Sequence, residues 1–459
     1  MTIRPRIVTP LPGPRAQALI ARDAAVVSPS YTRTYPFVMA RGAGAMVEDV
    51  DGNVFLDCAA GIAVSSTGHA HPAVVEAVCE QSRRFLHMSG TDFYYAAQVQ
   101  LAEEIAAIVP IDGGVRSFFS NSGAEAIEAC IKLARWSTKR SNLIAFFGGF
   151  HGRTLGALSL TASKSAQRRG FGVMMPGVYH APYPDVYRPA PGSPSPSADC
   201  LRFLEDRIFG QLVAPEEVAA IVVEPIQGEG GYIVAPDEFL QGLRTITARH
   251  GILLIVDEVQ SGMGRTGRMF AIEHSGVRPD LIAIAKGIAS GLPLGIAAAR
   301  ADVMTWPPGA HASTFGGNPV ACAASLATIG LLKEQLVANA AEVGAHLKAG
   351  LSSLMAAHPL VGDVRGRGLM IGVELVRDRM TKERADRERD AVVTAAFRRG
   401  LLVLGAGRNT IRFSPPLVLT REQADVAVEI FAEALAEIEA TCRHEALGGS
   451  KDMEHRRPA

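Results

Sequence analysis

Short apolar runs alternate with amphipathic helical patterns between about residues 70 and 300. The clearest runs are RSFFS (116–120), LIAFF (143–147), AAIVVE (219–224), ILLIVD (252–257) and LIAIA (281–285). Each run is followed directly by polar or glycine-rich residues. Because strands that alternate with helices are typical of βαβ units, this pattern predicts an α/β fold with a mainly parallel sheet.

The pattern changes near residue 329. A helix is followed by strands at GRGLMIGVEL (366–375) and TIRF (410–413), and then by a helix opened by Thr420 with Gln423 in capping-box spacing. We therefore expect a large α/β domain over 70–328, a small α+β domain over 329–459, and an N-terminal segment, 1–69, that packs with the small domain.

Two further segments have no regular apolar period. PAPGSPSPSA (189–198) predicts a surface loop, because proline, glycine and serine dominate it. RDRMTKERADRERD (377–390) mixes positive and negative residues along its length, which favours a solvated helix or loop over a binding patch.

Composition and charge exclude several classes of function. Lysine plus arginine and aspartate plus glutamate both total 46 among 459 residues, so no net charge directs the chain to nucleic acid or to an anionic membrane. No run of 18 apolar residues predicts a membrane span. The six cysteines lie far apart without zinc-ligand spacing, which predicts reduced thiols in a cytoplasmic protein and no metal site. An arginine-containing transit peptide at the N-terminus is the alternative.

Ligands of open α/β sheets bind beyond the carboxyl ends of the strands. After 116–120, Ser122-Gly123-Ala124 opens an amphipathic helix, and its N–H groups could cradle a phosphate, although a well-capped helix would look the same. After 143–147, GGFHGRT places Phe150, His151 and Arg153 at the same edge. Phe150 could stack on a planar cofactor or simply join the core.

A glycine motif after 252–257 invites a different interpretation. Gly262, Gly264 and Gly267 spell G-x-G-x-x-G, as in dinucleotide-binding folds. The turn before them carries Asp257 and Glu258, whose charge would repel a pyrophosphate. We interpret the motif as a coincidental match.

Lys286 follows the apolar run 281–285 much as Asp257 ends the run 252–257. A desolvated lysine becomes an amine nucleophile that can form a Schiff base. A nearby acid could keep a pyridine nitrogen protonated, as pyridoxal phosphate requires. The alternative, an Asp257–Lys286 salt bridge at the rim of the sheet, explains neither the phosphate-type helix start nor the aromatic turn.

Seven motifs, in this order, resemble those of the subgroup-III (ω-type, class-III) aminotransferases: NSGAEA, FHGRT, VVEPIQGEGG, VDEVQSGMGRTG, AKGIASGLPLG, STFGGNPVACAA and IRFSPPL. The resemblance covers nearly the whole chain. It is closest to the branch of 4-aminobutyrate and ornithine aminotransferases. It implies fold type I of the pyridoxal-phosphate enzymes, with a large, mainly parallel α/β domain and a smaller α+β domain.

The resemblance also implies roles around the cofactor. Lys286 would be the Schiff-base lysine and proton shuttle, and Asp257 the partner of the pyridinium nitrogen. The other residues implied to contact the cofactor are Ser122, Gly123 and Ala124 at the phosphate, Thr314 at the phosphate from the neighbouring subunit, Phe150 stacked on the ring, Val259 on the opposite face, Gln260 at the ring hydroxyl, and His151. The alternative for His151 is that it only braces the turn. Many relatives carry a hydroxyl residue at the position of Ala124, so one phosphate contact would be missing here.

Four residues would face the substrate, and Glu224 would be a catalytic acid beside it. Glu229 is implied to pair with Arg412 and to swing away when 2-oxoglutarate arrives. Arg412 would then bind the α-carboxylate and Arg153 the distal one, and Ile62 would line the same pocket.

The resemblance thus predicts an ω-aminotransferase that moves an amino group from 4-aminobutyrate, or a similar terminal amine, to 2-oxoglutarate by a ping-pong Schiff-base mechanism. Ornithine or lysine ω-transamination and amino-acid racemisation or epimerisation are the alternatives with the same cofactor. A catalytically idle cofactor-binding or regulatory protein is the alternative of a different class. The expected partners are an amino donor, a 2-oxo acid, and a second copy in a homodimer with shared active sites, or a tetramer.

Overall fold

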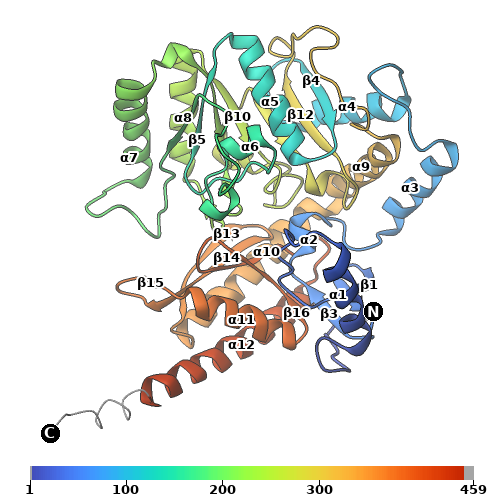
Figure 1. Cartoon of the computed structure of the whole chain (residues 1–459), viewed down its shortest axis with the longest axis vertical. Coiled ribbons are helices and arrows are strands. Elements are labelled where there is room, and N and C mark those ends of the chain that lie inside the picture. The colour runs from blue at the N-terminus through green and yellow to red at the C-terminus, as the bar shows by residue number, and fades with distance from the viewer. Residues whose placement is uncertain (1–2, 449–459) are drawn as a thin grey trace.

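The computed structural model describes residues 3–448 and has an upper and a lower part, each built on its own sheet (Figure 1). The sheet of the upper part has seven strands. Their order is β4 (Val115–Ser120), β12 (Gly295–Arg300), β11 (Leu281–Ile284), β10 (Leu253–Asp257), β7 (Val218–Val223), β5 (Asn142–Phe146) and β6 (Val178–Ala181). All five strands expected here are present, to within a residue or two at each end. The pairs from β11 to β6 are parallel, which confirms the predicted α/β class.

The strand β12 was not anticipated, and it runs antiparallel to both of its neighbours. Its sequence, GIAAAR, is dominated by alanine, so it lacks the β-branched and aromatic residues that mark a strand. Helices cover both faces of the sheet: α4 (Ala96–Ile108), α5 (Gly123–Thr138), α6 (Leu155–Leu160) and α8 (Asp237–His250) pack on its strands. Three further helices pack on these or on one another: α9 (Pro319–Leu331) on α4, α3 (Pro72–Arg84) on α9, and α7 (Pro196–Phe203) on α8.

The two faces of the sheet belong to two hydrophobic cores. On β10, Leu253 and Ile255 pack with α5 in one core, while Leu254 and Val256 face the main core with α8. This alternation is the period-two geometry of a strand that is buried on both sides. The carboxyl ends of β10 and β11 are thereby held at a fixed edge of the sheet.

The lower part contains strands from both ends of the chain. Its larger sheet has the order β13 (Val361–Arg367), β14 (Met370–Asp378), β18 (Thr410–Phe413) and β17 (Leu404–Ala406), with β15 (Glu383–Arg384) paired to β14. The helices α10 (Val337–Ser353), α11 (Asp386–Arg398) and α12 (Arg421–Gly448) pack with this sheet. As predicted, Thr420 and Gln423 cap α12 reciprocally, with N–H to side-chain oxygen distances of 3.1 and 3.2 Å.

A second sheet joins the N-terminal segment to the lower part. Its order is β1 (Met39–Ala43), β2 (Met46–Asp49), β3 (Val54–Asp57) and β16 (Leu401–Leu402), so a strand of the C-terminal region pairs with β3. The helices α1 (Pro14–Val26) and α2 (Ala60–Ala63) and the short hairpin of β8 (Ile226–Gln227) and β9 (Ile233–Val234) complete the fold. We propose that the chain is divided into 1–69, 70–328 and 329–459, and the pairing of β3 with β16 supports the packing of the first part with the third.

Three local predictions need correction. The run 366–375 is not one strand, because Gly368, with a left-handed φ of 54°, turns the chain between β13 and β14. The charged run 377–390 is neither one helix nor one loop: it completes β14, turns, forms β15 and enters α11. The loop 189–198 ends early, because Pro196 begins α7.

One helical run, Pro319–Ala356, is long and apolar enough by composition to cross a membrane. Half of its most apolar window is buried within the protein, and Leu332 and Leu347 belong to the main core. Packing in that core accounts for the apolar composition of this run. Among residues 3–448, no three His, Cys, Asp or Glu side chains are grouped so that they could hold a metal ion.

Candidate active site

A cavity of about 470 Å³ lies at the carboxyl ends of the central strands. It collects most of the residues that the sequence analysis selected: Ser122, Gly123, Ala124, Phe150, His151, Arg153, Glu224, Asp257, Val259, Gln260 and Lys286. Ile62, Glu229, Thr314 and Arg412 are not among the lining residues. Segments that are far apart in the sequence therefore meet at one site, as the sheet-edge argument predicts.

Lys286 follows β11 and lies in the left-handed region, with a φ of 50°. A residue with a side chain rarely adopts this conformation, and such strain is found most often at functional sites. Burial lowers the pKa of Lys286, and the positive charge of Arg412 lowers it further against the opposing effect of Asp257. The amine is thus shifted toward its neutral, nucleophilic form.

Asp257 ends β10 and is only 4% exposed. Its Oδ2 lies 2.7 Å from Nδ1 of His151, and its Oδ1 accepts a hydrogen bond of 3.0 Å from the N–H of Val259. The pair formed by Asp257 is therefore with His151 and not with Lys286, so the alternative of a rim salt bridge is wrong. Burial would lower the pKa of His151, but the hydrogen bond and charge of Asp257 outweigh it and raise that pKa.

Glu224 supports the backbone around the cavity. Its carboxylate accepts hydrogen bonds from the N–H groups of Phe150 (3.0 Å) and Gly228 (3.1 Å). Burial raises the pKa of Glu224 to about 7; the charge of His151 opposes this shift and that of Asp257 adds to it. A carboxyl group with a pKa near neutral can exchange protons at physiological pH.

The N-terminus of α5 forms the other end of the cavity. Oγ of Ser122 caps the helix by accepting a 3.2 Å hydrogen bond from the N–H of Glu125. The first N–H groups of a helix have no acceptor within it, so they suit an anion. Gly123 keeps this end open, because a Cβ there would lie 2.7 Å from Val259.

Asn121 also lines the cavity, and the sequence analysis missed it. Its side-chain amide donates to Glu125 (2.9 Å) and to Oγ of Ser313 (3.3 Å). Asn121 thereby connects the start of α5 to the loop that contains Thr314. Its place directly before Ser122 in NSGAEA was the available signal. The other lining residues that were not anticipated are Val64, Gly152, Ala285, Gly291, Leu292, Pro293 and Leu294.

Gln260 is oriented by a residue that the sequence did not single out. The hydroxyl of Tyr232 donates a 2.9 Å hydrogen bond to Oε1 of Gln260. Because that bond uses the amide oxygen, the amide nitrogen is left as a donor. Tyr232 itself is fully buried and has a positive φ of 55°.

Arg412 and Glu229 form a buried ion pair next to the cavity. Nη1 of Arg412 lies 2.5 Å from Oε1 of Glu229, and the two side chains are 6% and 17% exposed. Burial would raise the pKa of Glu229, but the charge of Arg412 outweighs it and lowers that pKa. This is the pair that the resemblance implied. Its effect on the pKa of Lys286 shows that Arg412 is electrostatically coupled to the amine.

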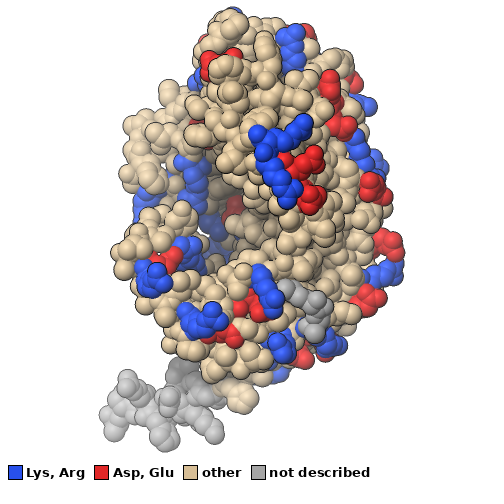
Figure 2. Space-filling view, turned by 90° about the vertical axis from the view of Figure 1, so that its right-hand side faces the viewer, with Lys and Arg blue, Asp and Glu red and all other residues tan. Residues whose placement is uncertain are grey.

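Arg153 lies at the exposed rim, and its guanidinium carbon is 5.6 Å from the ring centroid of Phe150. No carboxylate of residues 3–448 forms an ion pair with it, so its charge is available to a ligand. Figure 2 shows a hollow between the upper and lower parts with Lys and Arg side chains along one edge. Ile62 and Thr314 are exposed on the surface of this single chain.

The donor set fits pyridoxal phosphate. Lys286 provides a half-buried amine, Asp257 a buried carboxylate for a ring nitrogen, and α5 an open N-terminus for a phosphate. Phe150 and Val259 line the space between them. Gly152 also keeps the cradle clear, because a Cβ there would lie 2.7 Å from that of Ala124.

Glu258, next to Asp257, has a structural role. It is fully buried, and its carboxylate accepts hydrogen bonds from Oγ of Ser261 (2.6 Å) and the N–H of Ile272 (2.7 Å). Burial raises its pKa to about 7, so folding favours its protonated form. The stability that this proton provides is fully present below the unfolded pKa near 4.5 and is lost as the pH rises through about 7.

We expect Glu258→Gln to remove that loss, because a glutamine can donate to Ser261 and accept from Ile272 without titrating. The free energy of unfolding of the variant minus that of the wild type should rise by roughly 3 kcal/mol between pH 5 and pH 8. Urea unfolding at both pH values measures it. A difference that does not change with pH would contradict this account of Glu258.

Comparisons with known proteins agree with this geometry. Residues 26–435 match the model of the family described as aminotransferase class-III. An alanine/serine racemase of Pyrococcus horikoshii is 40% identical, with 94% of this chain and 92% of the relative covered. A 4-aminobutyrate aminotransferase of Mycobacterium tuberculosis is also 40% identical, over 94% and 98%. The PLP-bound crystal structure of an amine transaminase from an uncultivated Pseudomonas species superimposes with a TM-score of 0.82 at 32% identity, covering 90% and 98% of the two chains.

Proposed function

Because this chain belongs to the class-III aminotransferases, which depend on pyridoxal phosphate, we propose that it transfers the amino group of 4-aminobutyrate, or a similar terminal amine, to 2-oxoglutarate. The observation that carries the choice of substrates is the buried Arg412–Glu229 pair beside Lys286. While Glu229 neutralises Arg412, the site has little attraction for an α-carboxylate. A donor whose only carboxylate is remote from its amine suits that state.

The acceptor half-reaction needs the opposite state. We propose that Glu229 leaves Arg412 when 2-oxoglutarate arrives, so that the guanidinium binds the carboxylate next to the oxo group. Arg153, which pairs with no carboxylate in the described part of the chain, then binds the distal carboxylate. Two arginines with different states of pairing would let one site accept a monocarboxylate and a dicarboxylate in turn.

Three side chains of the protein would act with the bound cofactor. The bound cofactor supplies an electron sink for the carbon that carries the amine. Lys286 would hold the cofactor through its amine and, once the substrate amine has displaced it, would move a proton at that carbon. Asp257, held by His151 and the N–H of Val259, places a negative charge that favours a proton on the ring nitrogen. Glu224 fixes the backbone of Phe150 at the edge of the site.

A steady-state comparison of donors tests the proposal. The holoenzyme is given 2-oxoglutarate with 4-aminobutyrate, L-ornithine, L-lysine or L-alanine, and L-glutamate formation is measured. We expect 4-aminobutyrate to give the largest kcat/KM. A larger kcat/KM with L-ornithine or L-lysine would show that this amine, and not 4-aminobutyrate, is the donor. Interconversion of L- and D-amino acids without glutamate formation would favour racemisation, as the similarity to the alanine/serine racemase allows.

Arg412→Ala should separate the two half-reactions. We expect the KM for 2-oxoglutarate to rise by about 100-fold, because the variant lacks the bidentate contact to the α-carboxylate and leaves Glu229 paired only with the more distant Lys164, at 4.0 Å. The donor half-reaction should change much less. Glu229→Gln is the matched control, because it frees Arg412 and should improve L-glutamate relative to 4-aminobutyrate as a donor. Equal losses in both half-reactions would contradict the proposed role of Arg412.

We also propose that two copies pair through an apolar surface beside the cavity. Five side chains of this surface are 39–99% exposed: Phe85, Leu86, Met88, Phe93 and Tyr94. The loop of Thr314 adjoins it, since Phe315 contacts His87 with ring centroids 5.0 Å apart. Exposed apolar surface of this kind marks an interaction site. In such a pair, Thr314 of each copy would contact the phosphate held by the other.

Replacing both Phe93 and Tyr94 with glutamate should produce monomers, because each charge would be buried in the proposed contact. Light scattering after gel filtration measures the mass, and titration with pyridoxal phosphate measures cofactor affinity, which we expect to fall at least about tenfold. The matched control is Val173→Glu, a change at a side chain that is 95% exposed. A dimer that persists in the double variant would contradict this surface.

A further inference from the structure

A second cavity, of about 720 Å³, shares no residue with the active site. Its lining comes from Arg188, in the loop between β6 and α7, and from the segment 377–408 of the lower part, which includes β15 at the left of Figure 1. The lining residues are Arg188, Arg377, Thr381, Lys382, Glu383, Arg384, Asp386, Arg387 and Arg408. Six of them are cationic and two are acidic, in a chain with no net charge.

Only part of this positive charge is neutralised within the chain. Arg408 pairs with Asp386 at 3.0 Å, and Arg377 pairs with Glu383 at 2.9 Å and with Glu388 at 2.7 Å. Among residues 3–448, Lys382, Arg384 and Arg387 have no carboxylate partner within ion-pair distance. The cavity therefore holds three cations that no carboxylate of residues 3–448 approaches to within ion-pair distance.

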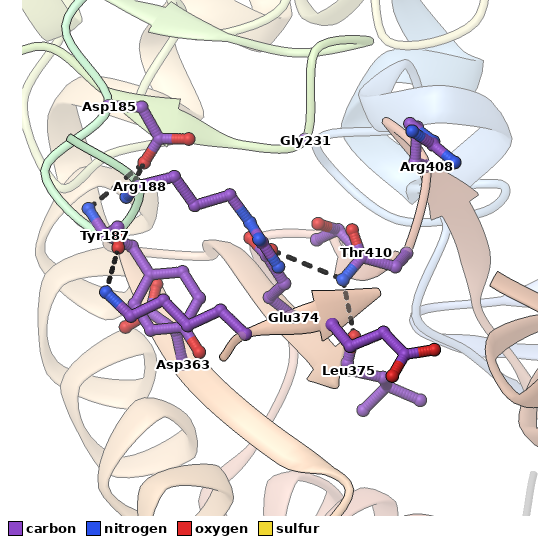
Figure 3. A network of polar contacts seen from close by, with 12 residues as sticks. Asp185, Tyr187, Arg188, Gly231, Asp363, Glu374, Leu375, Arg408 and Thr410 are labelled. Carbon is purple, nitrogen blue, oxygen red and sulfur yellow. Dashed lines mark hydrogen bonds and ion pairs between the residues drawn. The ribbon is translucent and has the colours of Figure 1, made fainter. Parts of the chain in front are cut away.

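Arg188 adds a buried donor to these three cations. Its Nε donates a 2.6 Å hydrogen bond to Oε1 of Glu374, whereas its Nη2 is buried and has no hydrogen-bond partner. Figure 3 shows Arg188 reaching from its loop to Glu374 of the lower part, with Arg408 on the far side of Thr410. A buried N–H group without an acceptor is rare in folded proteins, so Arg188 carries an unsatisfied donor at the edge of the cavity.

The cations also disfavour one another. Burial lowers the pKa of Arg384, and the charges of Arg188 and Arg408 lower it further, while those of Glu374 and Asp386 oppose the shift. An anion placed between Arg384, Arg188 and Arg408 would reduce the repulsion among these three charges.

The chemistry of the lining limits what could bind. Five of the six cations are arginines, whose planar guanidinium groups match phosphate and carboxylate oxygens in pairs. The volume lies within the range of small-molecule sites. None of the described residues that line the cavity has an aromatic ring.

We propose that this cavity binds a small anion with several negative charges, carried by phosphate or carboxylate groups. The ligand would tie the loop of Arg188 to the segment 377–408. Segment 377–390 therefore serves as more than the solvated face that its sequence suggests, because folding brings Arg188 and Arg408 to it.

Calorimetric titration of the holoenzyme at low ionic strength tests the proposal. Bound pyridoxal phosphate keeps the probe from the helix terminus of α5. Pyrophosphate and citrate are the probes, and their relative affinity decides between the phosphate and the carboxylate form of the ligand. We expect one site per chain, with affinity at least about tenfold weaker in Arg384→Gln/Arg387→Gln. The matched control Arg22→Gln, at an exposed arginine of α1, should bind as the wild type does.

The single variant Arg387→Gln separates loss of binding from loss of the fold. Because the side chain of Arg387 is exposed, we expect this variant to bind the probe more weakly while its thermal midpoint without ligand stays unchanged. Absence of binding of both probes to the wild type would overturn the proposal. Equal binding by the wild type and the folded variants would overturn it as well, since the anion would then bind elsewhere.

Discussion

Replacing Lys286 with alanine should abolish transamination, lowering kcat by at least about 10⁴-fold, because the variant has neither the amine nucleophile nor the proton carrier. The half-buried position of Lys286 after β11, where it lines the cavity, and its lowered pKa are the observations behind this expectation. Lys286→Arg should be equally inactive, since a guanidinium keeps the charge but cannot act as the nucleophile. The visible absorbance of the bound cofactor and the rate of glutamate formation are the two readouts.

A matched lysine far from the site separates this effect from general damage. Lys333 pairs with Glu104 on the surface, and Lys333→Ala should retain the wild-type rate. The thermal midpoint of Lys286→Ala should not fall, because the change removes a charge that burial disfavours. Activity of Lys286→Ala within tenfold of the wild type would show that another residue performs the chemistry.

Asp257→Asn should retain cofactor binding but lower kcat by about 10²- to 10⁴-fold. Asparagine can still accept the hydrogen bond from the N–H of Val259, so the local backbone should hold. The change removes the negative charge that favours a proton on the ring nitrogen. Single-turnover rates of wild type and variant measure the loss in the chemical step.

The same variant makes a prediction about His151. The pKa of His151 is raised because the hydrogen bond and charge of Asp257, with a smaller contribution from Glu224, outweigh the effect of burial. In Asp257→Asn, burial should prevail and bring that pKa below its ordinary value. Titration of the histidine resonances by NMR measures the shift. An unchanged pKa of His151 together with a near-wild-type rate would exclude Asp257 as the electrostatic partner of the cofactor.

The sequence predicted the elements whose pattern is local. Apolar runs bounded by polar turns identified β4, β5, β7, β10 and β11, and the edge argument brought Asp257 and Lys286 together. The alanine-rich β12 and the turn at Gly368 were missed, because a strand of small residues has no β signature and a glycine does not reveal its φ. The register of long-range pairs such as β3 with β16 is set by packing rather than by local sequence.

The candidate site, too, was only partly predictable from the sequence. Motif order placed Ser122, Phe150 and Lys286 at one cavity, but no spacing indicates that His151 pairs with Asp257 or that Tyr232 orients Gln260. These contacts join residues 28–106 positions apart and exist only after folding. The cationic cavity around Arg188 was invisible for the same reason.

The most direct test of the proposed function is a single half-reaction. Purified enzyme with bound pyridoxal phosphate is mixed with 4-aminobutyrate in the absence of any acceptor, and the visible absorbance of the cofactor is followed in time. We predict rapid loss of that absorbance and its return when 2-oxoglutarate is added. An absorbance that does not change with 4-aminobutyrate, while L-ornithine or a branched L-amino acid changes it, would contradict the assignment of the donor.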